Sequence, residues 1–91
     1  MNEKLLEIYD KCMKHNIPIS MKFMLSDAAI EVTGEILAYD KSSKKYEHLR
    51  HEKWVSIHEM KRVNNIDLVA STIDEIFNAL NNRKDELSSE V

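Results

Sequence analysis

The sequence predicts an α+β fold in which two amphipathic helices flank a strand-rich middle. Apolar residues recur at helical spacing near each end of the chain, and they alternate with a period of two in residues 17–25 and 29–40. Helical spacing places apolar side chains on one face of a helix, whereas alternation places them on one face of a strand. Because the strands are short and hairpin-sized, we predict a small antiparallel SH3-like or Sm-like barrel of about five strands. The alternative is an open antiparallel sheet covered on one face by both helices.

The first predicted helix covers residues 2–15. Asn2 can cap its N-terminus, and Asn16 can take the left-handed conformation that ends many helices. Pro18 then prevents the helix from continuing. The apolar stripe of this helix consists of Leu5, Ile8, Tyr9, Cys12 and Met13.

Two alternating segments follow and are predicted to be strands. In residues 17–25 every second side chain is apolar, from Ile17 to Leu25. Residues 29–40 contain Gly34, the only glycine of the chain. A glycine inside a strand usually marks a bulge or a sharp bend, and such a bend lets a small sheet curl into a barrel. We therefore expect the chain to bend at Gly34.

The rest of the chain divides into shorter elements and a final helix. We predict turns at residues 40–44 and 51–53, strands at 45–50, 54–57 and 61–66, and a single helical turn at 58–60. The last helix is predicted at residues 72–87, where Thr72 and Glu75 have capping-box spacing. Residues 1–91 are predicted to form one domain, with the barrel in residues 17–66. Val63 and Ile66 are expected to point inward from the last strand.

Composition indicates a soluble protein of the reducing cytosol. The chain is 43% apolar and 32% charged, which is ordinary for a folded domain. Its charged N-terminus has no apolar leader, and no stretch approaches the ~20 apolar residues of a membrane span. Cys12 is the only cysteine, so no internal disulfide can form. We predict a cytoplasmic location, and because so small a core is marginal, we expect a protein partner or a homo-oligomer.

Basic residues concentrate in the middle of the chain. Residues 41–62 hold seven lysines and arginines and three acids, although the whole chain has a net charge of −3. If this segment binds nucleic acid, the contacting residues are predicted to be Lys44, Lys45, Tyr46, Arg50, Lys61 and Arg62. We favour the simpler interpretation that these residues form an ordinary solvated face. Trp54 is likewise expected to pack in the core or at its rim rather than to stack on bases.

The residues argue against catalysis. A single glycine placed within a strand excludes a glycine-rich phosphate loop, and no nucleophile motif is present. The spacing of Cys12 and His15, and of His48 and His51, could supply zinc ligands. Strand positions three apart point to opposite faces, however, and Cys12 lies on an apolar stripe. We therefore predict no enzyme activity, no metal and no cofactor.

The order of these segments resembles a known family. The alternating strand 17–25, the strand 30–40 with Gly34 followed by apolar residues and Asp40, and the stretch from Trp54 to Val63 resemble the YolD-like family of small bacterial and phage proteins. The order is also similar, more weakly, to that of Sm-like RNA-binding proteins. The YolD-like resemblance implies an accessory or regulatory protein associated with Y-family DNA polymerases and the DNA damage response. It implies no catalytic residues.

Three functional hypotheses follow from the sequence. The first is a small non-catalytic regulatory or accessory protein, encoded by a phage or mobile element, that binds a larger protein partner. The second is a nucleic-acid-binding barrel that uses the basic segment 41–62. A small zinc protein or metal-dependent enzyme is a third and weaker hypothesis.

Overall fold

The computed structural model describes residues 3–62 and 65–89. Its elements are α1 (Glu3–His15), β1 (Ile19–Met24), a short 3-10 helix η1 (Leu25–Asp27), β2 (Ala29–Asp40), β3 (Lys45–Ser56), α2 (Ile57–Arg62) and α3 (Asn65–Ser88). They form an elongated molecule of 45 × 30 × 17 Å. The predicted cap Asn2 and the inward residue Val63 lie outside the described residues.

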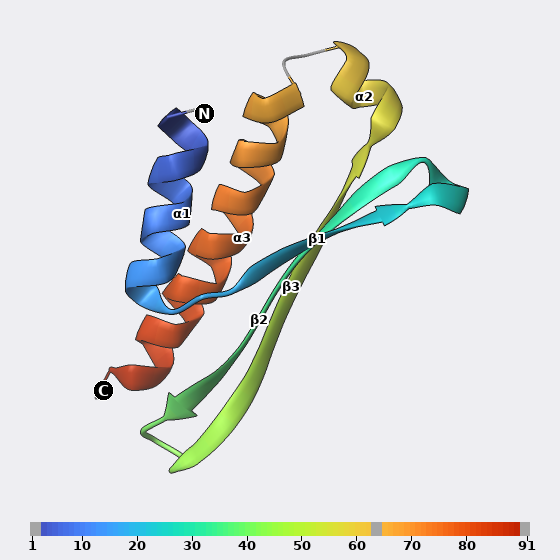
Figure 1. The fold of residues 1–91 in the computed structure, drawn as a ribbon. Helices are drawn as coiled ribbons and strands as arrows, with labels where there is room; N and C mark the ends of the chain where they lie inside the picture. Colours follow the sequence, from blue (N-terminus) through green and yellow to red (C-terminus); the bar gives the residue numbers. More distant parts are fainter. Residues whose placement is uncertain (1–2, 63–64, 90–91) are drawn as a thin grey trace.

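The sheet is open, so the predicted five-stranded barrel is wrong although the α+β class is right. The described strands form a three-stranded antiparallel sheet in the order β1-β2-β3. A closed barrel requires every strand to have two neighbours, whereas in the described chain β1 and β3 each pair with β2 alone. Both long helices lie on one face of this sheet (Figure 1). This arrangement is the open-sheet alternative.

Two errors in the strand assignment explain why the barrel prediction fails. The predicted turn at residues 51–53 lies inside β3, which pairs with β2 without a break from Lys45 to Ser56. Polar residues are tolerated there because β3 is an edge strand, and Lys53 pairs with Glu75 of α3. The predicted strand at 61–66 is absent, because its described residues belong to α2 and α3. Too few strands remain to close a barrel.

Gly34 has a different role from the one its position in the sequence suggests. Of the bulge or bend that Gly34 suggests, a bulge is absent, because the pairing of β2 continues without an extra residue through Gly34, which faces Ile19 on β1 and His51 on β3. A Cβ atom at this position would lie 2.5 Å from Leu80 Cδ1 and 2.8 Å from Ile76 Cγ2, both on α3. Gly34 therefore allows α3 to approach the sheet closely.

The C-terminal helix is longer than predicted. It begins at Asn65 rather than at residue 72, although its predicted course through residues 72–87 is confirmed. Thr72 does not cap a helix, because its hydroxyl donates to the carbonyl of Leu68 at 2.8 Å, one turn earlier in α3. A hydroxyl in mid-helix commonly makes this bond, so capping-box spacing alone misplaced the helix start.

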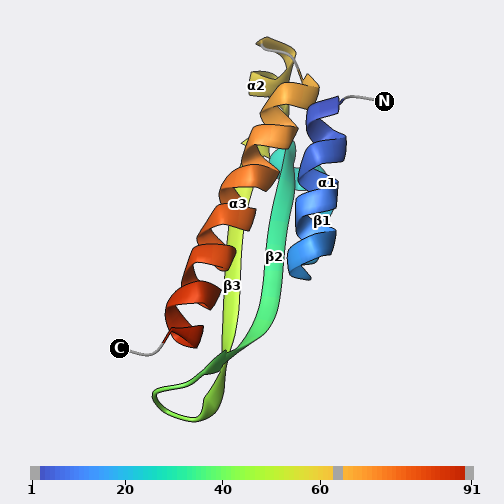
Figure 2. The same cartoon turned by 90° about the vertical axis from the view of Figure 1, so that its left-hand side faces the viewer.

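The core lies between α3 and the sheet. Seen from the helix side, α3 runs over β2 and β3, and α1 lies beside α3 on the side of β1 (Figure 2). The core cluster consists of Ile8, Ile17, Ile30, Val32, Ile36, Ala38, Leu49, Ala70, Ile73, Ile76, Phe77, Leu80 and Leu87. Polar contacts also join the helices, since Lys11 lies 2.6 Å from Asp74 and the Lys84 amine donates to the carbonyl of His15 at 2.9 Å. Asn16 has the predicted left-handed conformation, with a φ of 54°.

Candidate functional site

The open face of the sheet is the first candidate site. We use this name for the side chains of the three strands that point away from the helices. They are Ser20, Lys22, Glu31, Thr33, Glu35, Leu37, Tyr39, Tyr46, His48, Arg50, Glu52 and Trp54, as the register and the alternation with buried positions require. No element of the described chain covers this face.

Large apolar and aromatic side chains are exposed on the open face. Tyr46 is 71% exposed, Leu37 68%, Trp54 45% and Tyr39 44%. Tyr39 and Tyr46 are cross-strand partners, and their rings meet edge to face at 5.3 Å. The face thus holds the only tryptophan of the chain and two of its three tyrosines. Trp54 is 45% exposed, so it lies at the rim of the fold, one of the two packing positions expected for it, and not in the core.

The charges of the open face are arranged in opposite pairs. His48 Nε2 lies 2.5 Å from a carboxylate oxygen of Glu35 on the neighbouring strand. Arg50 lies 3.1 Å from Glu52 on the same strand. Both pairs are about half exposed, so each stabilises the fold by at most about 1 kcal/mol. Their main consequence is that Arg50, and His48 when it is protonated, each have an acidic neighbour on this face.

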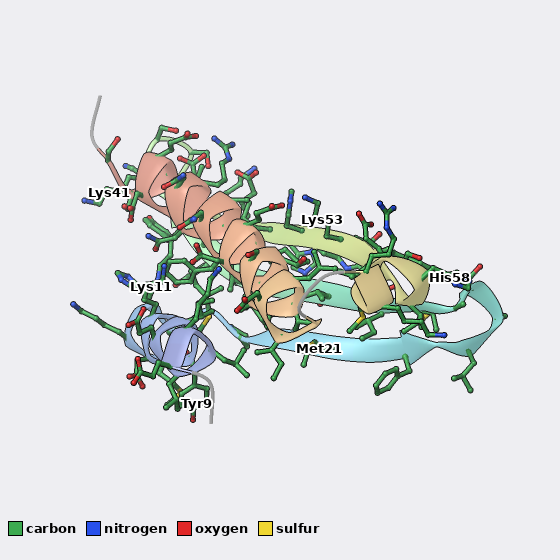
Figure 3. All side chains as sticks on the ribbon, turned by 90° about the horizontal axis from the view of Figure 1, so that it is seen from above. Tyr9, Lys11, Met21, Lys41, Lys53 and His58 are labelled. Atoms are coloured by element: carbon green, nitrogen blue, oxygen red, sulfur yellow. The ribbon has the colours of Figure 1, made fainter. Side chains whose placement is uncertain are left out.

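The structure does not bring the six predicted nucleic-acid contacts together. Lys44, Lys45 and Tyr46 lie at the hairpin that joins β2 to β3, whereas Lys61 and Arg62 lie on α2, beyond the other end of β3. At ~3.3 Å per residue, β3 alone separates these two groups by roughly 36 Å. The labelled residues Lys41 and His58 accordingly lie at opposite ends of the molecule (Figure 3). Arg50 lies between the two groups, paired with Glu52.

Asp40 organises the hairpin turn. Its carboxylate accepts hydrogen bonds from the backbone N–H of Ser42 at 3.0 Å and from the hydroxyls of Ser42 and Ser43 at 2.7 and 2.9 Å. These bonds, led by the one from the Ser42 hydroxyl, hold the pKa of Asp40 below its ordinary value. Lys44 closes the turn with a left-handed φ of 58°. The predicted turn at residues 40–44 is therefore confirmed.

An apolar cleft between α1 and β1 is the second candidate site. It has a volume of about 410 Å³ and is lined mainly by Leu5, Ile8, Tyr9, Cys12, Met13 and Ile19, with Met21 at its rim. Partial burial here raises the pKa of the Cys12 thiol. Met21 and Phe23 share one face of β1, as the alternation of the first strand predicts, and the register places this face on the helix side of the sheet; the helices leave both residues more than half exposed.

The two pairs whose spacing could have supplied zinc ligands do not meet. Cys12 and His15 lie on α1, where the ring of His15 packs edge to face against Phe77 at 5.5 Å. His48 and His51 lie on β3, and His48 pairs with Glu35. Residues 3–62 and 65–89 contain no group of three or more His, Cys, Asp or Glu side chains placed to hold a metal ion. Within the same residues, no helix is long and apolar enough to cross a membrane.

Comparison with known proteins gave no relative. No protein-family model matches the chain, and neither the curated proteins nor the solved structures include a match. The resemblance to the YolD-like family therefore stays a prediction.

Proposed function

We propose that this protein is a small non-catalytic module that regulates or assists a larger protein partner, and that the partner binds the open face of the sheet. The observation that favours this function is the exposure of Leu37, Tyr39, Tyr46 and Trp54 on a single face. Tyrosine and tryptophan are enriched in protein interfaces, where a large ring is desolvated and its polar atom finds a partner.

The size of this surface suits a protein partner. Taking ~150–250 Å² for each fully exposed large side chain, the four residues together expose roughly 450 Å². A standard interface buries about 800 Å² on each partner. The four apolar residues would thus supply about half of such an interface, and the neighbouring ion pairs would form its polar rim.

Charge also favours a protein over a nucleic acid on this face. A surface that binds phosphates presents cations whose counterions are released on binding. Here Arg50 and His48 each have a carboxylate within 3.1 Å. Paired charges of both signs contribute to the specificity of protein recognition instead.

Photo-crosslinking identifies the partner. A benzophenone amino acid replaces Tyr46 on the open face in the source cells, and in a matched strain it replaces Tyr9 on α1. A protein captured from position 46 and not from position 9 is then purified as the partner. The resemblance to the YolD-like family makes a Y-family DNA polymerase the first candidate.

Affinity measurements with the purified partner complete the test. We expect Tyr46→Ala and Trp54→Ala to weaken binding by at least about 30-fold, the effect of losing a residue that dominates an interface. The control is Ile66→Ala, which shortens another exposed apolar side chain, on α3. If the open-face variants bind as tightly as this control, the proposal is wrong.

Nucleic-acid binding by the hairpin between β2 and β3 is the second candidate function. Lys41, Lys44 and Lys45 lie within five residues of one another at its tip, beside the exposed ring of Tyr46. Fluorescence anisotropy with single-stranded RNA and DNA across a salt series tests this interaction. Binding through these lysines would weaken steeply with salt and be lost in the Lys44→Ala/Lys45→Ala variant. Absence of binding at low salt would exclude it.

A further inference from the structure

We infer that two copies of this chain associate through β1, which forms one continuous sheet across the pair. This inference goes beyond the proposed function, because it concerns a different surface: the free edge of β1 together with the α1–β1 cleft.

The edge of β1 is poorly protected against pairing. In the described chain β1 pairs with β2 on one side only. Edge strands are usually blunted by several charged side chains, by inward-pointing charges, by prolines or by bulges, and β1 has one lysine and none of the other three. The sequence of β1 is Ile-Ser-Met-Lys-Phe-Met, in which Lys22 is the only charge and points to the open face. The pairing of β1 with β2 also proceeds without a bulge from Ile19 to Met24.

Apolar side chains beside this edge are exposed on both α1 and β1. Tyr9 and Met13 on α1 are 59% and 65% exposed, and Met21 and Phe23 on β1 are 56% and 71% exposed. α1 and β1 diverge after they are joined near Pro18 (Figure 1). Tyr9 lies on the side of α1 away from α3, whereas Lys11 lies on the side that faces α3 (Figure 3). The cleft of about 410 Å³ opens between these two diverging elements.

Each copy has the α1–β1 cleft and, on β1, the exposed ring of Phe23, which can enter the cleft of the other copy. If two copies of β1 pair antiparallel with Met21 facing Met21, Ile19 of each copy faces Phe23 of the other. Directly opposed residues of an antiparallel pair point to the same side of the sheet. Because Ile19 lines the cleft, each Phe23 ring is brought to the mouth of the other copy's cleft. Such a surface is self-complementary, as a two-fold interface requires.

Area and composition also favour a second copy as the occupant. At ~200 Å² for a fully exposed large side chain, Tyr9, Met13, Met21 and Phe23 expose roughly 500 Å² per copy. Burial of both sets would remove about 1,000 Å² from water, which is about the minimum for a specific interface and below the ~1,200 Å² at which stable interfaces begin. The cleft is lined almost entirely by apolar residues. Homodimer interfaces are more apolar than interfaces between proteins that also exist separately. The apolar cleft therefore suits a second copy, whereas the open face, with its mixture of aromatic and charged residues, suits a separate partner.

The pair would have six strands and two exposed open faces. Antiparallel pairing of two identical edges places the two-fold axis perpendicular to the sheet. The helices of both copies then lie on one side, and both open faces lie on the other. A larger partner could contact the two open faces together.

Sedimentation equilibrium over about 1–500 μM protein tests the association. We expect a concentration-dependent increase from the chain mass of 10.7 kDa to twice that value. Phe23→Glu should raise the dissociation constant at least about 30-fold, since it places a charge among the apolar side chains of the interface. Leu37→Glu is the matched control, because Leu37 is equally exposed but lies on the open face, and it should still dimerise. A wild-type protein that stays monomeric, or a dimer that Phe23→Glu does not weaken, would overturn the inference.

Cysteine cross-linking tests the register independently of any folding effect. In a Cys12→Ser background, Met21→Cys should form an intermolecular disulfide under Cu(II)-phenanthroline oxidation, because opposed Cα atoms lie within disulfide range. Leu25→Cys should not, since its copies would lie roughly 26 Å apart at ~3.3 Å per residue. Equal cross-linking at both positions would contradict the register. Neither outcome bears on partner binding at the open face, which is measured with different variants.

Discussion

Replacing Gly34 with alanine tests the close approach of α3 to the sheet. The added Cβ would lie 2.5 Å from Leu80 Cδ1 and 2.8 Å from Ile76 Cγ2, whereas ordinary contacts begin at 3.4 Å. The two methyl groups must therefore retreat by about 0.9 and 0.6 Å. Leu80 and Ile76 are 3% and 0% exposed, so they can retreat only into a packed core.

The expected loss of stability is roughly 1 kcal/mol, from the middle of two opposing ranges. An extra methyl group in a filled core costs about 1–3 kcal/mol. Alanine offsets roughly 0.5–1 kcal/mol of this, because glycine loses more conformational freedom on folding. Each kcal/mol lowers the melting temperature of a domain of this size by about 4–8 °C.

Urea denaturation followed by circular dichroism measures this loss at a fixed protein concentration. The double variant Gly34→Ala/Leu80→Ala supplies the mechanistic control. Leu80→Ala alone should cost about 2–5 kcal/mol by creating a cavity. It also leaves room for the new Cβ, so Gly34→Ala should cost at least about 0.5 kcal/mol less in this background. Additive effects, or a Gly34→Ala variant as stable as the wild type, would refute the proposed role of Gly34.

Three further experiments test the core, the hairpin turn and the environment of Cys12. Ile76 is fully buried, so Ile76→Ala should lower the free energy of unfolding, measured by urea denaturation, by about 2–5 kcal/mol. Leu25 is 89% exposed, so Leu25→Ala should change the free energy of unfolding by less than about 0.5 kcal/mol. Similar values for the two variants would contradict the described core. Because the pKa of Asp40 is lowered in the folded state, its contribution to stability is present above its unfolded pKa of about 3.9 and is lost as the pH falls through the folded value. The free energy of unfolding of Asp40→Asn should therefore fall less than that of the wild type when the pH is lowered from 5 to below the folded pKa of Asp40. The same pH dependence in both proteins would show that the hydrogen bonds of the turn contribute nothing to stability. Burial raises the pKa of Cys12, so a disulfide reagent at pH 8 should modify it more slowly than a cysteine in an unfolded peptide; an equal rate would place the thiol in water.

Local chemistry in the sequence predicted several elements well. The end of α1 was predicted from Asn16 and Pro18. Asn16 adopts the left-handed conformation that ends a helix, and Pro18 has no backbone N–H to donate to the preceding turn, so both residues determine the helix end locally. The bounds of β2 followed from alternation and from the turn residues beyond Asp40. In each case the determining interactions join residues close in sequence.

Features that depend on distant contacts could not be predicted in this way. Gly34 suggested a bulge, but the atoms that exclude a side chain there belong to Leu80 and Ile76, more than 40 residues further along the chain. The alternation of the first strand assigned Phe23 to the same face as Met21 without showing that no helix covers it. Alternation specifies the face of a strand, and only the placement of the helices decides whether that face is buried.

The candidate site illustrates the same limit. The basic segment 41–62 is compact in sequence, but a 12-residue strand extends through it and separates its two ends. The open face did leave a signal, since Leu37 and Tyr39 are apolar at positions that alternate with the core residues Ile36 and Ala38. Apolar residues on both sides of a strand indicate either a second buried layer or an interaction surface. No second layer is present in the described chain, which favours the interaction surface.

The separation of core and surface makes the binding tests interpretable. The side chains that hold the fold together lie between α3 and β2, and those examined by the binding variants lie on the open face or beside the edge of β1. Substitutions of exposed residues away from the core usually change stability by less than about 0.5 kcal/mol. Tyr46→Ala should therefore keep the wild-type unfolding midpoint, and so should Phe23→Glu at a protein concentration low enough for the wild type to be monomeric. A loss of partner binding in the first variant, or of dimerisation in the second, would then report on the interface itself.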